Sequence, residues 1–216
     1  MRKVWTLLGF LFLALNAGAA IAEPLRLTVF GDSLVQGYGL PQGQGLVPQL
    51  SRWLADQGAE AELANAGVSG DTTAGGAARI GWTLADKPDG IIVLLGGNDL
   101  LRGLHPEEAE ANLRSILQQS HAAGVEVLLV GMRAPGNFGP QYKQVFDNIY
   151  PQIAPEFDAL LHPDAFAGIR AKVGEDPAAA RDYMQGDNIH PNAAGVALNV
   201  AALGPKVLEL IRRIQG

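Results

Sequence analysis

The 216-residue chain contains no cysteine, and this absence excludes several kinds of chemistry. It leaves no disulfide, no thiol nucleophile and no thiolate or iron–sulfur metal site. Positive charge is also scarce: the chain has 16 lysines and arginines but 22 acidic residues, so its formal net charge is −6. An acidic chain without a lysine or arginine cluster is not expected to bind nucleic acid or anionic membrane surfaces. The hydrophobic core alone must stabilise the fold, and a chain of this length can bury one that is large enough.

Long apolar runs are confined to the N-terminus, where residues 1–22 have the pattern of a secretory signal peptide. Arg2 and Lys3 precede an apolar run over residues 4–15, and Ala20-Ile21-Ala22 forms a cleavage site. An uncleaved membrane anchor is the alternative, although the run is short for a spanning helix. We expect cleavage after Ala22 and no later membrane-spanning segment. Residues 23–216 would then form a single periplasmic or secreted domain of formal charge −8, because the leader holds two of the cations.

The rest of the chain alternates short apolar runs with amphipathic segments. The predicted strands are residues 25–30, 62–64, 90–95, 125–131 and 159–161. The predicted helices are residues 46–57, 73–85, 106–123, 146–154, 165–173 and 192–214. This alternation predicts an α/β fold, a three-layer α/β/α sandwich around a mostly parallel five-stranded sheet. Functional residues of such sheets gather at the carboxyl ends of the strands.

A serine follows the first predicted strand directly, in Gly31-Asp32-Ser33-Leu34. The first tight turn after a buried strand is a place where a nucleophilic hydroxyl can be exposed. We expect Gly31 to adopt a backbone conformation that a side chain would disfavour. The alternative is an ordinary serine that caps a helix. Because position 35 is valine, Ser33 does not lie in the Gly-x-Ser-x-Gly nucleophile elbow of the α/β-hydrolases.

A serine nucleophile requires a base, and the chain offers four histidines. His121 lies within a predicted helix, His105 lies beside a helix start, and His162 is a weak candidate. His190 follows Asp187 by three residues, so the carboxylate can accept from Nδ1–H and leave Nε2 free to take the serine proton. A structural Asp–His turn is the alternative. A metal site is not expected, because the chain has no His-Glu-x-x-His motif and its histidines are far apart.

Donors for an oxyanion follow three of the predicted strands. The candidates are the backbone N–H of Ser33, the backbone N–H of Gly70 and the side-chain amide of Asn98. Gly70 lets the backbone approach a ligand closely, and Asn98 offers a donor without a charge to desolvate. One such donor lowers the barrier to acyl transfer by about 3 kcal/mol. A plain loop glycine and a turn or helix-cap asparagine are the alternatives.

Four short blocks, taken in order, resemble those of the SGNH, or GDSL, hydrolases. They are Gly31-Asp32-Ser33-Leu34, Gly70-Asp71-Thr72, Gly96-Gly97-Asn98-Asp99 and Asp187-x-x-His190. The resemblance covers nearly all of residues 25–200. It is strongest to the periplasmic bacterial esterases with combined thioesterase, arylesterase and lysophospholipase activity. Residues 166–184 are longer and less apolar than this subgroup leads us to expect, which leaves the acyl-chain preference open.

The resemblance implies a flavodoxin-like SGNH fold and a role for each matching residue. Ser33 would be the nucleophile, His190 the base and Asp187 the orienting acid. Ser33, Gly70 and Asn98 would bind the oxyanion. We expect further substrate contacts from Asp32, Leu34, Pro135, Asn137, Phe138 and Ile189. No cofactor or metal is implied, and the expected partner of this monomer is a small-molecule ester or thioester.

The predicted function is hydrolysis of carboxylic esters and thioesters through an acyl-enzyme on Ser33. Aryl esters, short-to-medium acyl esters, acyl-CoA and lysophospholipid are the candidate substrates. One alternative is an O-acetyl esterase acting on polysaccharide or peptidoglycan, and another is a non-catalytic exported binding domain. We expect the loop of residues 134–142 to flank the acyl pocket, because it follows a strand end on the same edge of the sheet.

Overall fold

The structure, a computed structural model, describes residues 24–216, so the predicted signal peptide and its cleavage site lie outside the described residues. A sheet of five strands forms the centre of the fold. The strands are β1 (Leu25–Gly31), β2 (Ala61–Gly67), β3 (Gly90–Leu94), β4 (Glu126–Val130) and β5 (Leu160–His162). Their spatial order is β2-β1-β3-β4-β5, and every pairing is parallel. This is the flavodoxin-like order, and it confirms the predicted fold class.

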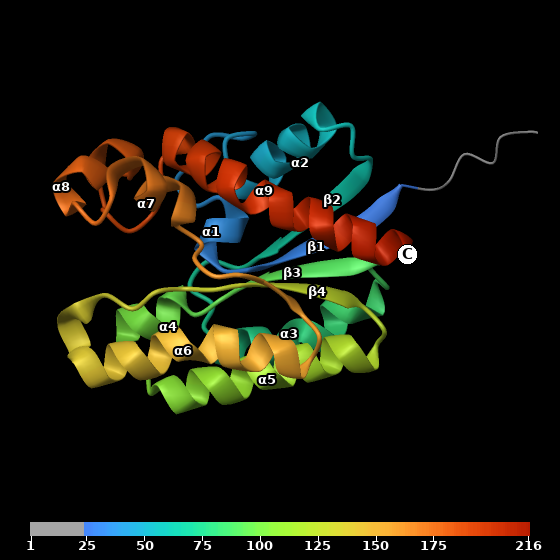
Figure 1. Cartoon of the computed structure of the whole chain (residues 1–216), viewed down its shortest axis with the longest axis horizontal. Helices are drawn as coiled ribbons and strands as arrows, with labels where there is room; N and C mark the ends of the chain where they lie inside the picture. Colours follow the sequence, from blue (N-terminus) through green and yellow to red (C-terminus); the bar gives the residue numbers. More distant parts are fainter. Residues whose placement is uncertain (1–23) are drawn as a thin grey trace, which may run out of the picture.

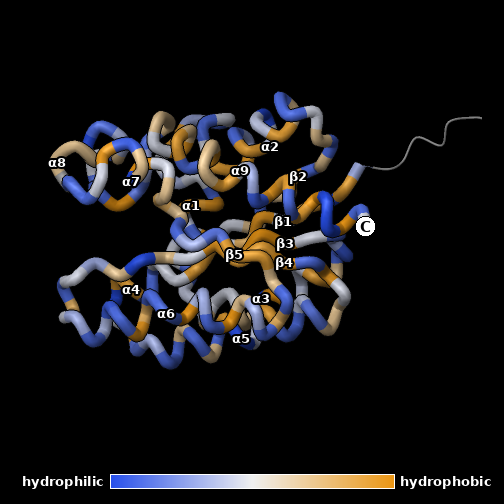
Figure 2. The backbone as a smooth tube through the Cα atoms, viewed as in Figure 1, coloured by the Kyte–Doolittle hydropathy of each residue, from blue (hydrophilic) through white to orange (hydrophobic). Residues whose placement is uncertain are grey.

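Helices cover both faces of the sheet and complete the three layers (Figure 1). One layer contains α3 (Thr73–Ala85), α4 (Gly97–Arg102), α5 (Pro106–Ala122) and α6 (Pro140–Glu156). The other contains α1 (Ser33–Gln36), α2 (Leu46–Asp56), α7 (Ala167–Val173), α8 (Pro177–Ala180) and α9 (Ala193–Gln215). Two short 3-10 turns, η1 (Gly136–Phe138) and η2 (Arg181–Tyr183), lie in the loops. Apolar residues concentrate on the strands between the layers (Figure 2), and β3 is buried along its whole length, as its unbroken apolar run predicts.

Two elements are longer than predicted. α6 begins at Pro140, six residues before the predicted helix and inside the predicted loop. A proline in the first turn of a helix loses no hydrogen bond, because the N–H groups there have no intrahelical partner. β2 has seven residues where three were predicted, because its polar and half-exposed positions pair with β1 throughout.

α9 contradicts the expectation that no segment after the leader is long and apolar enough to span a bilayer. This helix of 23 residues passes that test by length and composition, with a mean hydropathy of 1.5 over its most apolar window. Half of that window is buried inside the fold, and the helix packs on α2, α7 and the sheet. Its buried face contains Val196, Val200, Leu203, Val207, Leu210 and Ile211. These contacts identify α9 as a core helix of the sandwich.

The parallel sheet brings distant segments of the chain to one edge. Ser33 opens α1 directly after β1, Asn98 lies in α4 after β3, and His190 precedes α9. Because β1 and β3 run in the same direction, the residues that follow them meet at the carboxyl edge of the sheet. Figure 1 shows α1, α4 and α7 gathered at this edge.

We predict that Leu210→Ala lowers the free energy of unfolding by about 2–5 kcal/mol, because Leu210 is fully buried and its truncation leaves a cavity. Leu208→Ala on the same helix is the control, since that side chain is only partly buried, and a smaller loss is expected. Urea denaturation followed by circular dichroism measures both losses. Equal losses would contradict the packing of α9 described above.

Candidate active site

Ser33, His190 and Asp187 form a continuous chain of hydrogen bonds at the carboxyl edge of the sheet. Oγ of Ser33 lies 2.8 Å from Nε2 of His190, and Nδ1 of His190 lies 2.7 Å from Oδ2 of Asp187. An ionised carboxylate can only accept, so Nδ1 carries the proton and Nε2 accepts from the serine hydroxyl. The arrangement gives a hydroxyl nucleophile, a base and an acid that orients the base.

Asp187 is held as an anion by the N–H groups of its own turn. Its Oδ1 accepts from the backbone N–H of Ile189 at 2.9 Å and from that of His190 at 3.0 Å. Hydrogen bonding, led by the backbone N–H of His190, lowers the pKa of Asp187 to about 2. Asp187 is therefore ionised at neutral pH and can stabilise a positively charged imidazole.

The turn that carries His190 is fixed by its own hydrogen bonds. The N–H of Gln185 donates to the carbonyl of His190 at 2.7 Å, and the N–H of Asn188 donates to the carbonyl of Gln185 at 3.0 Å. Asn188 has a φ of 56°, which asparagine tolerates better than most residues. The ring of Tyr38 packs against the imidazole, with 4.8 Å between the ring centroids. The orientation of His190 is thus set by this turn, which includes Asp187, and by the ring of Tyr38.

The position of Ser33 depends on close packing at Gly31. The expectation of an unusual backbone conformation at Gly31 is wrong, because its φ is not positive. Glycine is needed there for space, since a Cβ would collide with the carbonyl oxygen of Leu94. Asp32 accepts from the N–H of Leu34 at 3.0 Å and caps α1. Ser33 is therefore the first helical residue, and the cap is its neighbour Asp32.

The predicted oxyanion donors line the same cleft as Ser33. Gly70 has a φ of 84°, which requires glycine in practice. Within residues 24–216, the backbone N–H groups of Ser33 and Gly70 donate to no other residue. Asn98 lies within α4, and its Nδ2 donates to the carbonyl of Asp71 at 2.9 Å and to Oδ2 of Asp32 at 3.3 Å. The second contact is long, so an oxyanion can compete for that amide hydrogen.

The cleft has a volume of about 470 Å³. Most of the predicted site residues line it: Asp32, Ser33, Leu34, Gly70, Asn98, Pro135, Asn137, Ile189 and His190. Asp187 lies outside the lining and contacts it through His190. Phe138 also lies outside, because its ring packs against Gly103 and against Tyr142, with 5.0 Å between the two ring centroids. Phe138 therefore does not line this cleft, where we expected it to contact the substrate.

Several residues of the cleft were not singled out from the sequence. They are Tyr38, Ser69, Gly97, Leu100, Leu101, Met132, Arg133, Phe166 and Asn188. Ser69, Gly97 and Asn188 each adjoin a predicted site residue, so their neighbours could have indicated them. Met132 and Phe166 carry no reactive group, and only the three-dimensional fold brings them to the cleft.

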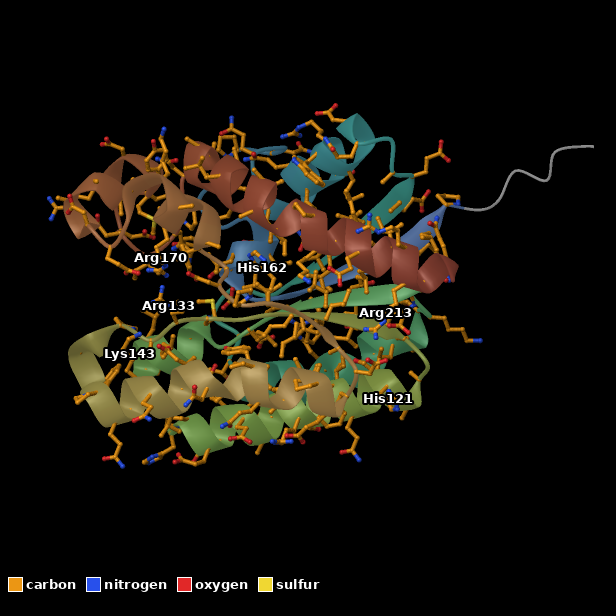
Figure 3. All side chains as sticks on the ribbon, viewed as in Figure 1. His121, Arg133, Lys143, His162, Arg170 and Arg213 are labelled. Atoms are coloured by element: carbon orange, nitrogen blue, oxygen red, sulfur yellow. The ribbon has the colours of Figure 1, made fainter. Side chains whose placement is uncertain are left out.

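The other three histidines lie away from Ser33. His162 ends β5 and is buried, and burial lowers its pKa. His105 precedes α5, and His121 lies on α5 at the opposite end of the molecule from Arg133 (Figure 3). Within residues 24–216, no group of three or more histidine and acidic side chains is arranged to hold a metal ion.

Asp32 is the second carboxyl group of the candidate site, and its surroundings are opposite to those of Asp187. Only 1% of its surface is exposed. Burial raises the pKa of Asp32 to about 6, against the lowering effect of the Leu34 N–H and the Asn98 amide. Asp32 therefore titrates in the mildly acidic range.

A serine, a histidine and an aspartate linked in this order at the edge of an α/β/α sandwich define a serine hydrolase. The candidate oxyanion donors beside them are of the kind that acyl transfer requires. The chain belongs to the GDSL-like lipase/acylhydrolase family, whose model matches residues 29–198. This membership confirms the predicted family and enzyme class.

Individual relatives extend over most of the chain. It is 40% identical over 187 residues to esterase TesA of Pseudomonas aeruginosa, a match that covers 86% of this chain and 88% of the relative. It is 38% identical to thioesterase 1/protease 1/lysophospholipase L1 of Escherichia coli, over 86% and 84% of the two chains. The solved structure of AlinE4, an SGNH-hydrolase family esterase, is 44% identical with a TM-score of 0.70, over 88% of this chain and 98% of that one.

We predict that Asp32→Asn changes the pH dependence of stability. In the native state Asp32 binds its proton up to about pH 6, whereas the unfolded carboxyl loses it near pH 3.8. The native protein therefore holds the extra proton between these values, and its stability falls as the pH rises through them.

The asparagine variant lacks this effect, so its stability relative to wild type should increase by up to about 3 kcal/mol between pH 4 and pH 7. Any hydrogen bond lost with the substitution is the same at both pH values and cancels. Urea denaturation at a series of pH values measures the difference. A constant difference would contradict a buried, proton-binding Asp32.

Proposed function

We propose that the protein is a serine esterase that hydrolyses carboxylic esters and thioesters through an acyl-enzyme on Ser33. The observation that carries the proposal is the unbroken series of contacts from Asp187 through His190 to Ser33, at 2.7 and 2.8 Å. A cleft opens directly beside the hydroxyl at the end of this series.

In the proposed reaction, Oγ of Ser33 attacks the ester carbonyl while Nε2 of His190 takes the hydroxyl proton. Asp187 stabilises the resulting imidazolium. The N–H groups of Ser33 and Gly70 and the Asn98 amide bind the oxyanion of the tetrahedral intermediate. His190 then gives its proton to the leaving alcohol or thiol, and water hydrolyses the acyl-enzyme by the same steps in reverse order.

The lining of the cleft supports acyl and aryl esters as substrates. Leu101 and Ile189 line the cleft and are 57% and 42% exposed, so their apolar surface is open to a ligand. The relatives above are named as an esterase and as a thioesterase and lysophospholipase. We therefore propose aryl esters, short-to-medium acyl esters, acyl-CoA and lysophospholipid as the candidate substrates.

A second hollow of about 770 Å³ adjoins the cleft and offers room for a large leaving group. Arg133, Pro135, Phe166 and Asn188 line both spaces. Glu175 also lines the hollow and pairs with Arg133 at 3.1 Å and with Arg170 at 3.2 Å. Arg133 lies in the loop after β4 and Arg170 on α7, and the two side chains lie near one another in Figure 3. Substrates that extend past the scissile bond can therefore be accommodated on this side.

The proposed site of action is the periplasm or the extracellular space. The signal-peptide pattern of residues 1–22 supports export, with a mature monomer that spans residues 23–216 and has no membrane anchor after cleavage. The proposed partner is a small-molecule ester or thioester.

We predict that Ser33→Ala lowers kcat for p-nitrophenyl esters by about 10⁴–10⁶-fold, because it removes the nucleophile and leaves only binding and the oxyanion donors. A fluorophosphonate should label wild-type protein at Ser33 and leave the variant unlabelled, as mass spectrometry of the peptides would show. Ser69→Ala is the matched control, because Ser69 lines the same cleft but bonds to Gln36. Absence of turnover and of labelling in folded wild-type protein would instead indicate a non-catalytic binding domain.

A further inference from the structure

Arg79 of α3 lies beside the carboxyl ends of the paired strands β1 and β2, and its guanidinium donates hydrogen bonds to three acceptors. Nη2 donates to the carbonyl of Gly31 at 2.8 Å, and Nη1 donates to the carbonyl of Ala66 at 3.0 Å. Nε donates to Oδ2 of Asp71 at 2.6 Å. The guanidinium carbon also lies 3.9 Å from the centroid of the Phe30 ring. One side chain therefore connects both strand ends with the loop that follows β2.

Two of the three acceptors of Arg79, the Gly31 carbonyl and the Asp71 carboxylate, belong to residues close to candidate oxyanion donors. Gly31 lies two residues before Ser33 on the same tight turn. Asp71 directly follows Gly70, and the carbonyl of Asp71 accepts from Nδ2 of Asn98 at 2.9 Å. Ser33 and Gly70 therefore lie within two residues of a residue that Arg79 binds. The Asn98 amide is hydrogen-bonded to one of these residues, Asp71.

The surroundings of Arg79 make these contacts specific. The side chains of Arg79 and Asp71 are only 18% and 15% exposed, so water screens their ion pair weakly. The three acceptors lie in different directions around a planar fork, which an arginine can match and a lysine cannot. Arg79 is not part of the described lining of the cleft, so it has no contact with a ligand bound there.

We propose that Arg79 is a positioning residue of the oxyanion hole. It holds the Gly70 loop, and through Asp71 the Asn98 amide, at the spacing from Ser33 that a tetrahedral intermediate requires. This inference rests on the proposed function, because an oxyanion forms only if Ser33 attacks a carbonyl. A donor that is misplaced acts weakly on the transition state, while binding of the uncharged ester is little affected.

A double-mutant cycle between Arg79 and Asn98 tests the proposal. Asn98→Ala removes one donor and should lower kcat by about 10²–10³-fold. Arg79→Met should lower kcat by about 10–100-fold with KM nearly unchanged, and Arg79→Lys should recover only part of the loss. In the Asn98→Ala background the same Arg79→Met change should lower kcat by a smaller factor than in the wild type, because one of the donors that Arg79 helps to position is already absent while the Gly70 donor remains.

Arg114→Met is the matched control. Arg114 also binds carboxylates through its guanidinium, those of Glu110 and Glu156, but it lies on α5 away from the strand ends. Its replacement should leave kcat unchanged. Should Arg79→Met fail to fold, Gly75→Ala can replace it in the cycle, because a Cβ at Gly75 would collide with the Asp71 carboxylate and displace it from Arg79.

The outcomes separate this inference from the proposed function. An unchanged kcat in Arg79→Met, or the same loss with and without Asn98, would overturn the role of Arg79 while the Ser33→Ala variant remained inactive. A Ser33→Ala variant that kept the wild-type kcat would overturn the proposed function itself. A loss of kcat that is smaller in the Asn98→Ala background than in the wild type would support the positioning role.

Discussion

The hydrogen bond between Ser33 and His190 joins residues 157 positions apart, and much of the architecture serves to make it possible. The hydroxyl follows the first strand of the sheet, and the imidazole precedes the last helix. They meet because β1 is an inner strand of a parallel sheet and α9 packs across the face that α1 also covers. The core therefore determines the active-site geometry, since a shift of α9 against the sheet would part the two side chains.

The two carboxyl groups of the site have opposite environments and therefore different properties. Asp187 lies in an exposed turn whose N–H groups stabilise its charge, so its pKa is low. Asp32 is buried beside the nucleophile, and its pKa is high. A permanent anion next to the histidine suits the imidazolium that forms there. Burial raises the pKa of Asp32 only to about 6, so this carboxyl group keeps its proton in mildly acidic solution and is mostly ionised at neutral pH.

Much of this arrangement can be predicted from the sequence. The continuous apolar run of β3 and the largely apolar runs of β1 and β4 identify buried parallel strands, and the spacing of Asp187 and His190 identifies a base with its orienting acid. Elements that depend on tertiary contacts escape such reasoning. Pro140 resembles a loop residue but begins a helix, and the polar strand β2 is visible only through its pairing with β1. No sequence motif indicates the role of Arg79, because its three acceptors come together only when β1 and β2 have paired.

The central claim is that Asp187 fixes the imidazole of His190 with its proton on Nδ1 and its Nε2 open to Ser33. Nitrogen-15 NMR of histidine-labelled protein, at a pH where His190 is neutral, reports directly which ring nitrogen carries the proton. The account predicts a proton on Nδ1 of His190 in the wild type and a mixture of tautomers in Asp187→Ala. A proton on Nε2 in the wild type, or a tautomer that does not respond to the loss of Asp187, would contradict it.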